Sequence, residues 1–312
     1  MGRKLILSIL LLFVPMLAKT QEYNGDVRVA KGDINGDGYI DAADVVALIR
    51  IIMNQEETEK EVQKIDSADV HIEEVLDLGN KFRAMQGMTV WGNYLYQFYS
   101  SSRCRVFNLL NKESVSELQL PEGHYGSVAF SNEYGGEGEE IPLLYVGGSM
   151  AAKTNPGYTV VNMNTGDVSS VDFDSETASQ VLCVFDFDSG IGYSFGYKDN
   201  DPDHEAAPYE VTPFDISTGK CDVSNRFFLE NEGHLQDAFY DNGKIWICTG
   251  WSTQWNGVDI PVKIVGIDPV QKITTTVLTL GFLNHEAEGI AIWGSGFLIS
   301  MRKSYKVYSV LF

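Results

Sequence analysis

Most of the chain alternates apolar and polar residues in short runs, a pattern typical of β-strands. From about residue 77 onward these runs are rich in Val, Ile, Tyr, Phe and Trp, and Gly, Asn, Asp and Pro interrupt them. β-Branched and aromatic side chains favour strands, and the interrupting residues favour turns. Helical spacing of apolar residues is confined to residues 42–64. The pattern therefore predicts an all-β domain preceded by a small helical segment.

A unit made of a hydrophobic strand pair followed by further strands and turns recurs five times after residue 80. The units open at Met85, His124, Ser179, His234 and His285. Their spacing of about 40 to 55 residues suits a four-stranded blade of a β-propeller. The sequence thus predicts a five-bladed β-propeller over residues 81–312. A β-sandwich, which needs no repeat, is the alternative fold.

The last unit ends at Phe312 and is too short to contain an outer strand. The segment VHIEEVLDL, residues 70–78, can supply that strand from the N-terminal side of the domain. Closure of this kind pairs both of the sheet edges that would otherwise be exposed. We therefore assign residues 65–80 to a linker and a ring-closing strand.

Residues 1–20 have the composition of a secretory signal peptide. Arg3 and Lys4 precede an apolar run that is too short to cross a hydrocarbon core of about 30 Å as a helix. Cleavage is expected before Gln21, with cleavage after Ala18 as the alternative. A membrane anchor is the other interpretation of this segment, and no further apolar run is long enough for a span. We expect an exported protein, whether periplasmic, at the cell surface or extracellular.

Acidic residues dominate the mature chain. Removing Arg3, Lys4 and Lys19 with the leader takes the formal charge from −20 to −23. Such a field repels phosphate backbones, so we expect no nucleic-acid partner and no anionic membrane surface.

The cysteines are Cys104, Cys183, Cys221 and Cys248, and export would permit disulfides among them. Two of them lie in apolar strand-like runs, where a cysteine is more often a core residue. No Cys/His spacing typical of zinc appears. We expect core cysteines and leave the disulfide state open.

Residues 33–44, DINGDGYIDAAD, place oxygen-bearing residues at the calcium-ligand positions of an EF-hand loop. Gly38 occupies the position of the sharp turn. The expected calcium ligands are the side chains of Asp33, Asn35, Asp37, Asp41 and Asp44 and the backbone carbonyl of Tyr39.

The end of this loop on Asp44 and the helix-forming run VVALIRIIMN resemble a dockerin repeat over residues 31–54. The resemblance implies docking to a cohesin-like module. Dockerins carry two repeats, and here the stretch IDSADVHIEEVLDL resembles only the approach to a second one, without its D-x-N-x-D-G core. A calcium-stiffened spacer is the alternative role for this module, which we assign to residues 21–64.

Two short motifs resemble known propeller families. QGM at residues 86–88, followed by LYQF, and EAEGIAI at residues 286–292, followed by FLIS, are similar to phage receptor-binding and TagC-type propellers. Bacterial glutaminyl cyclase propellers are similar at the same two places. These resemblances imply the fold, and no catalytic motif carries over residue by residue.

In a propeller, the starts of the inner strands and the loops between second and third strands open on one face. Aligning the units puts Gln86, Gln236 and Glu288 at equivalent positions round the axis. Two tryptophans in a long joining loop can add stacking surfaces. The candidate ligand-binding residues of this face are Gln86, His124, Gln180, His234, Gln236, Asp237, Trp251, Trp255, His285, Glu286 and Glu288.

Two functions fit these residues. The first is binding of a glycan or cell-surface polymer, in which the tryptophans stack on sugar rings and the polar side chains bond hydroxyls. The alternative is a metal-assisted hydrolase or lyase acting on a polysaccharide or phosphorylated polymer, because clustered acids raise one another's pKa. The candidate catalytic residues are Glu286, Glu288, His124 and His234. The sequence leaves open whether the protein is an enzyme.

Overall fold

The computed structural model describes residues 40, 45, 62–81, 84–147, 156–174, 181–198, 207–250, 261–281 and 286–311. The chain divides into two compact units, residues 1–61 and residues 62–312. The predicted signal peptide and calcium loop fall in the first unit and, apart from residue 40, lie outside the described residues. The predicted helical run, residues 42–64, is described only at residue 45, which is helical, and at residues 62–64, where the helix prediction is wrong because Gln63 and Lys64 belong to a strand paired with a neighbouring sheet. The second unit is all-β.

Five sheets make up the second unit, and we number them as blades in chain order. Blade 1 contains β3 (Met85–Trp91), β4 (Tyr94–Tyr99), β5 (Arg103–Asn108) and β6 (Glu113–Gln119). Blade 2 contains β7 (Ser127–Phe130), β8 (Leu144–Gly147), β9 (Gly157–Val161) and β10 (Val168–Asp172). Blade 3 contains β11 (Leu182–Asp186), β12 (Ile191–Tyr197), β13 (Tyr209–Asp215) and β14 (Phe227–Leu229), with a 3₁₀ turn, η3 (Val223–Asn225), before β14.

The last two blades also take strands from the start of the unit. Blade 4 contains β15 (Leu235–Asp241), β16 (Lys244–Thr249), β17 (Val262–Asp268) and β18 (Ile273–Leu280), and β1 (Gln63–Asp66) adds a fifth strand parallel to β18. Blade 5 contains β19 (Ala287–Trp293), β20 (Gly296–Met301) and β21 (Lys306–Leu311), and β2 (His71–Asp77) completes it. A 3₁₀ turn, η1 (Ser67–Asp69), joins β1 to β2.

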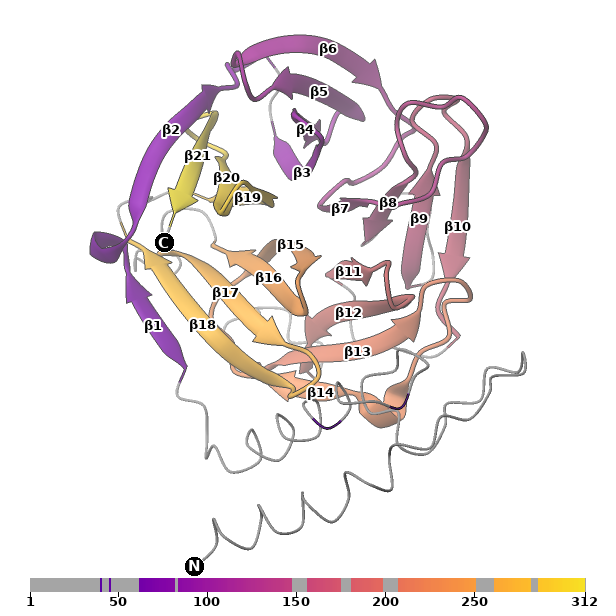
Figure 1. The fold of residues 1–312 in the computed structure, drawn as a ribbon, viewed down its shortest axis with the longest axis vertical. Coiled ribbons are helices and arrows are strands. Elements are labelled where there is room, and N and C mark those ends of the chain that lie inside the picture. The colour runs from indigo at the N-terminus through magenta and orange to yellow at the C-terminus, as the bar shows by residue number, and fades with distance from the viewer. Residues whose placement is uncertain are drawn as a thin grey trace, which may run out of the picture. The chain divides into compact units, whose positions relative to one another are not determined.

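The blades form a ring with β3, β7, β11, β15 and β19 nearest the axis (Figure 1). Strand β2 pairs antiparallel with β21, so a strand from the N-terminal side closes the ring, in the place that the sequence analysis gave to residues 70–78. The five-bladed propeller predicted from the repeat is confirmed. The parallel strand β1 on blade 4 was not anticipated, because its four residues are mostly exposed and carry little apolar pattern.

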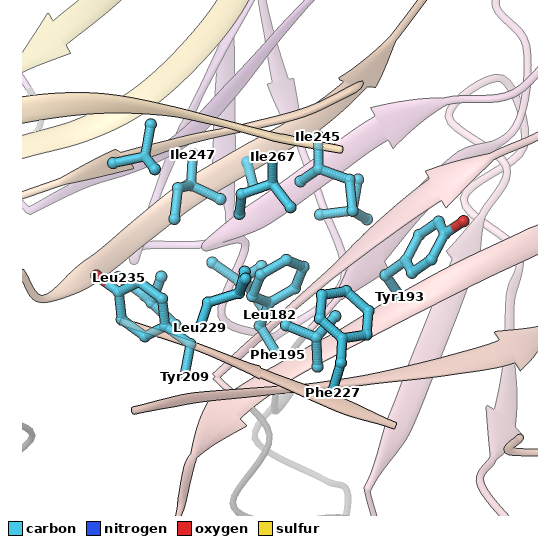
Figure 2. Packing of buried hydrophobic residues seen from close by; sticks show 14 of the residues in the cluster. Leu182, Tyr193, Phe195, Tyr209, Phe227, Leu229, Leu235, Ile245, Ile247 and Ile267 are labelled. Carbon is cyan, nitrogen blue, oxygen red and sulfur yellow. The ribbon is translucent and has the colours of Figure 1, made fainter. Parts of the chain in front are cut away.

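The hydrophobic core lies between the blades. Five clusters of buried side chains fill the five interfaces between neighbouring blades, including the interface of blade 5 with blade 1. Figure 2 shows the cluster between blades 3 and 4, where Phe195 and Tyr209 face Ile245 and Ile247. Alternate residues of each strand point toward these interfaces. Burying their apolar side chains stabilises the fold by about 25 cal/mol per Å² of apolar surface removed from water. Cys104, Cys183 and Cys248 are buried in these interfaces, as expected for core cysteines.

Glycines allow inner strands of neighbouring blades to approach closely. A Cβ atom on Gly87 would lie 2.5 Å from the carbonyl oxygen of Gly126 in the next blade, and the Gly87 N–H donates to the Tyr125 carbonyl at 2.9 Å. A Cβ on Gly289 would lie 2.9 Å from the backbone nitrogen of Met88. The QGM and EAEGIAI motifs therefore hold blades 1, 2 and 5 together at the axis.

Candidate functional site: the axial mouth

Three inner strands carry an irregularity at the same place. The pairing register shifts between Met85 and Met88 in β3, between Leu235 and Asp237 in β15, and between Ala287 and Gly289 in β19. The residues at these β-bulges include Gln86, Gln236 and Glu288, the three that the repeat alignment makes equivalent. A bulge re-aims a side chain and is common beside binding sites. We call the end of the axis where these strands begin the axial mouth.

Asp237 fixes the three bulged strands to one another. It is fully buried, and its Oδ2 accepts hydrogen bonds from the backbone N–H groups of Met88 at 3.2 Å and Ile290 at 3.0 Å. Its Oδ1 accepts from the N–H of Ala238 at 2.8 Å. One carboxylate thereby joins blades 1, 4 and 5, and both of its oxygens are engaged by the protein itself. Asp237 positions the mouth and does not project into it.

Glu286 and Glu288 share one guanidinium. Arg302, in the turn after β20, places its Nη1 at 2.8 Å from Glu286 Oε2 and 3.2 Å from Glu288 Oε1. The two carboxylates are nearly buried, whereas 45% of the Arg302 side chain is exposed. Arg302 is therefore the charged group of this trio that a ligand can reach.

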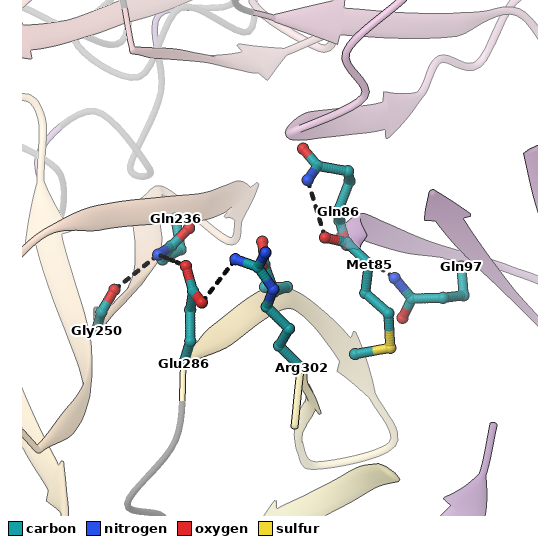
Figure 3. A network of polar contacts seen from close by, with 8 residues as sticks. Met85, Gln86, Gln97, Gln236, Gly250, Glu286 and Arg302 are labelled. Atoms are coloured by element: carbon teal, nitrogen blue, oxygen red, sulfur yellow. Dashed lines mark hydrogen bonds and ion pairs between the residues drawn. The ribbon is translucent and has the colours of Figure 1, made fainter. Parts of the chain in front are cut away.

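Amide side chains extend the polar network round the mouth. Gln236 donates to the Gly250 carbonyl at 2.7 Å and to Glu286 Oε1 at 3.3 Å, which links blade 4 to blade 5. In blade 1, the amide of Gln97 donates to the Gln86 carbonyl at 2.8 Å, and the Gln86 amide donates to the Met85 carbonyl at 2.9 Å. Figure 3 shows Gln236, Glu286 and Arg302 on one side of the mouth and Gln86 on another. Gln86 and Gln236 are both half-buried.

The two described histidines of the candidate set lie before inner strands of blades 2 and 4. His124 is exposed, although the protein around it desolvates the imidazole enough to lower its pKa. His234 is half-buried and stacks on Tyr197, with 6.2 Å between ring centroids. The Tyr197 hydroxyl in turn accepts from the backbone N–H of Leu235 at 2.8 Å. A buried tyrosine thus fixes the chain where it enters β15.

Burial raises the pKa of two carboxyl groups, Glu288 and Asp237. Desolvation, helped by the negative charge of Glu286, raises the pKa of Glu288 to about 8, although Arg302 opposes the shift. Complete burial also raises the pKa of Asp237 well above its usual range, against the effect of its three N–H donors. Glu288 can therefore hold a proton near neutral pH, as a hydrogen-bond donor or an acid/base group requires.

Buried polar atoms near the mouth remain unsatisfied. Within the described residues, Gln97 Oε1, Thr249 Oγ1 and Ser300 Oγ have no hydrogen-bond partner. Buried polar groups almost always have a partner, in the protein or in ordered water. The second strands of blades 1, 4 and 5 thus offer hydrogen-bonding capacity to water or to the hydroxyls of a ligand.

Several predicted residues lie outside the described part of the chain. They are Gln180, Trp251, Trp255 and His285 of the ligand-binding set and the calcium-loop residues Asp33, Asn35, Asp37, Tyr39, Asp41 and Asp44. Across the described residues, no group of three or more His, Cys, Asp or Glu side chains could hold a metal ion. The candidates that the structure does describe are Gln86, His124, His234, Gln236, Asp237, Glu286 and Glu288. Of these, Gln86, Gln236, Glu286 and Glu288 lie round Asp237.

The sequence analysis missed Arg302 and Gln97. Arg302 follows the second strand of the last unit, a position that opens on the same face as the inner-strand starts, so the repeat alignment could have identified it. Gln97 sits in the apolar run LYQF, where its polarity is the only signal.

Comparison with known protein families gives a match that begins in the N-terminal unit and reaches the first strands of the propeller. Residues 31–71 match the dockerin type I domain. Dockerin domains bind calcium, imply a cohesin partner and are found in extracellular proteins, which agrees with the calcium loop and with export. No helix among the described residues is long and apolar enough to cross a membrane.

The propeller is similar to solved structures in its fold. Glutaminyl cyclase from Myxococcus xanthus superposes with a TM-score of 0.50 at 10% identity, over 80% of this chain and 97% of that one. Hydrazine synthase from Kuenenia stuttgartiensis gives a TM-score of 0.41 at 15% identity, over 72% of this chain and 63% of that one. Comparison with curated proteins gives no match. The resemblance to TagC-type and phage receptor-binding propellers is not confirmed.

Proposed function

We propose that this protein is an exported propeller that binds a glycan or cell-surface polymer at its axial mouth, with a calcium-binding dockerin module at its N-terminus. The observation that carries the proposal is the set of three matching β-bulges. They bring Gln86, Gln236 and Glu288 to the same end of the axis, where Arg302 and unsatisfied hydrogen-bonding atoms also lie. Planar amide, carboxyl and guanidinium groups suit the paired hydroxyls of sugars.

The near-balance of charges at the axial mouth favours a neutral or weakly charged ligand. The Glu286 carboxylate balances Arg302, and Glu288 is largely protonated at neutral pH because its pKa is about 8. The chain as a whole carries a formal charge of −20, which disfavours nucleic acids. The calcium ion would be held by the residues of loop 33–44, and it would stiffen that loop for contact with a cohesin-like partner.

One observation favours a second candidate function, a hydrolase or lyase at the same mouth. Glu288 has a pKa near 8 and lies beside an arginine, as a general acid/base group would. In this case Glu288 would exchange a proton with the substrate and Arg302 would orient an acidic or hydroxyl group. The described residues contribute no cluster of metal ligands to this candidate.

The experiment that tests both candidates is a screen of the mature chain, residues 21–312, against a polysaccharide panel with calcium present. Affinity electrophoresis reports binding, and chromatography of the supernatant reports product release. We expect retention of at least one neutral or weakly charged polysaccharide without products. Products that disappear in Glu288→Gln would support the enzymatic candidate instead. Neither binding nor products across the panel would contradict the proposed function.

A further inference from the structure

Part of the dockerin sequence repeats within the chain. The hexapeptide IDAADV, residues 40–45, closes the calcium loop, and IDSADV follows at residues 65–70. The second hexapeptide lies inside the dockerin match, which extends to residue 71. Aligning the two makes Asp66 and Asp69 the counterparts of Asp41 and Asp44. Residues 58–69 therefore occupy the place of a second calcium loop.

The residues of this second loop do not fit a calcium ion. In the alignment, the counterparts of Asp33, Asn35, Asp37 and Gly38 are Thr58, Lys60, Val62 and Gln63. Lysine and valine offer no oxygen ligand, and calcium needs six to eight oxygens. The turn glycine is lost as well.

The described half of this second loop is a strand and a 3₁₀ turn rather than a calcium-binding loop, and its carboxylate binds backbone and hydroxyl groups. Gln63–Asp66 is extended as β1 and pairs parallel with β18. The Asp66 carboxylate accepts from the N–H of Ala68 at 3.0 Å and from the Ser67 hydroxyl at 3.3 Å, so it caps the 3₁₀ turn η1. A carboxylate used as a cap satisfies backbone donors in place of a cation.

The segment after IDSADV has also changed its role. The spacing of its apolar residues Ile72, Val75 and Leu76 departs from the strict alternation of a strand. Here they lie in strand β2, because a register shift between Glu74 and Leu76 restores the alternation that buries Leu76 and Leu78. The boundary between the two compact units falls between residues 61 and 62, inside the dockerin match.

We propose that residues 62–78, the second half of a dockerin repeat pair, have become the seam that closes the propeller, so that the chain binds a single calcium ion and presents one repeat to a cohesin-type partner. The seam spans two blades, since β1 extends blade 4 and β2 completes blade 5. Ile65, Val70 and Ile72 pack against the apolar cluster between those blades. This proposal rests on the calcium assignment of the proposed function and not on the axial mouth.

Calcium titration by isothermal calorimetry of the mature chain, residues 21–312, tests the proposal. We expect one ion per molecule in the wild type. The Asp66→Asn/Asp69→Asn variant should keep that stoichiometry and its affinity within about threefold, whereas the matched Asp41→Asn/Asp44→Asn variant should lose most of the affinity. A melting curve in excess EDTA adds a readout of the seam, because Asp66→Ala should lower the melting temperature without calcium.

The outcomes distinguish failure of the seam proposal from failure of the calcium assignment. Two ions per molecule, or loss of one ion in Asp66→Asn/Asp69→Asn, would overturn the seam proposal and leave the calcium assignment standing. No calcium binding by the wild type would overturn the calcium assignment and this proposal with it. An unchanged melting temperature for Asp66→Ala in EDTA would also count against the seam.

Discussion

Asp237 is the residue on which the geometry of the mouth depends. Its carboxylate receives N–H groups from blades 1 and 5 and from its own strand, while complete burial raises its pKa well above the usual range. The sequence analysis placed Asp237 among the ligand-binding residues because it stands at an inner-strand start. A sequence pattern does not reveal that two other blades each supply a backbone N–H donor to this carboxylate, at 3.2 Å and 3.0 Å.

Asp237→Asn is expected to destabilise the propeller by about 2 to 4 kcal/mol, because its amide NH₂ would face N–H donors that now have an acceptor. Guanidinium unfolding monitored by tryptophan fluorescence measures this loss. Asp241→Asn, at the other end of the same strand, is the matched control and should change stability by about 0.5 kcal/mol or less. Equal stability of Asp237→Asn and wild type would mean that Asp237 is protonated and that the amide replaces it.

Glu288 should make the stability of the protein depend on pH. Its folded-state pKa of about 8 lies above the ordinary glutamate pKa of about 4.5, so the folded state binds the proton more tightly than the unfolded chain does. This contribution is complete below about pH 4.5 and is lost as the pH rises toward 8. Each unit of pKa shift corresponds to about 1.4 kcal/mol.

Glu288→Gln removes this titration, so its stability relative to the wild type should rise by more than about 1 kcal/mol between pH 5 and pH 9. Guanidinium unfolding at several pH values measures the difference. Glu122→Gln, at an exposed loop position, is the control and should track the wild type. A relative stability of Glu288→Gln that stays constant between pH 5 and pH 9 would show instead that the ion pair with Arg302 keeps Glu288 ionised.

At the level of the elements, the seam determines whether the ring is closed. Strand alternation predicted the inner strands well, because both faces of each blade pack against neighbours. Strand β1 escaped prediction since its pattern is polar, and β2 was found only through the shortness of the last unit. The β-bulges escaped prediction too, because a register shift arises from pairing with a partner strand and leaves no period in the sequence.

Leu76→Ala in β2 is expected to cost about 2 to 5 kcal/mol, the range for a leucine lost from a packed interior. Leu76 is 3% exposed and packs between blades 5 and 1. Leu110→Ala is the matched control, since Leu110 is 69% exposed in a turn of blade 1. Urea unfolding of both variants tests the seam, and equal losses would contradict a closing role for β2.

At the scale of the whole molecule, the fold was readable from the repeat, whereas the site was readable only in part. Equivalent positions in the repeat identified Gln86, Gln236 and Glu288 as neighbours round the axis. The repeat could place Arg302 on the same face but could not show that Glu286 and Glu288 share its guanidinium, because that contact depends on how the three side chains pack. The match to a glutaminyl cyclase at 10% identity adds support for the fold and none for the chemistry.

The most direct test of the central claim is the affinity of mouth variants for the polysaccharide that the wild type binds most tightly in the panel. Gln86→Ala/Gln236→Ala removes two hydrogen-bonding side chains worth about 1 kcal/mol each, so we predict a loss of roughly thirtyfold. Gln271→Ala, in the exposed β17–β18 turn on the opposite face, is the control and should bind like the wild type. Unchanged affinity of the double variant, or an equal loss in Gln271→Ala, would contradict binding at the axial mouth.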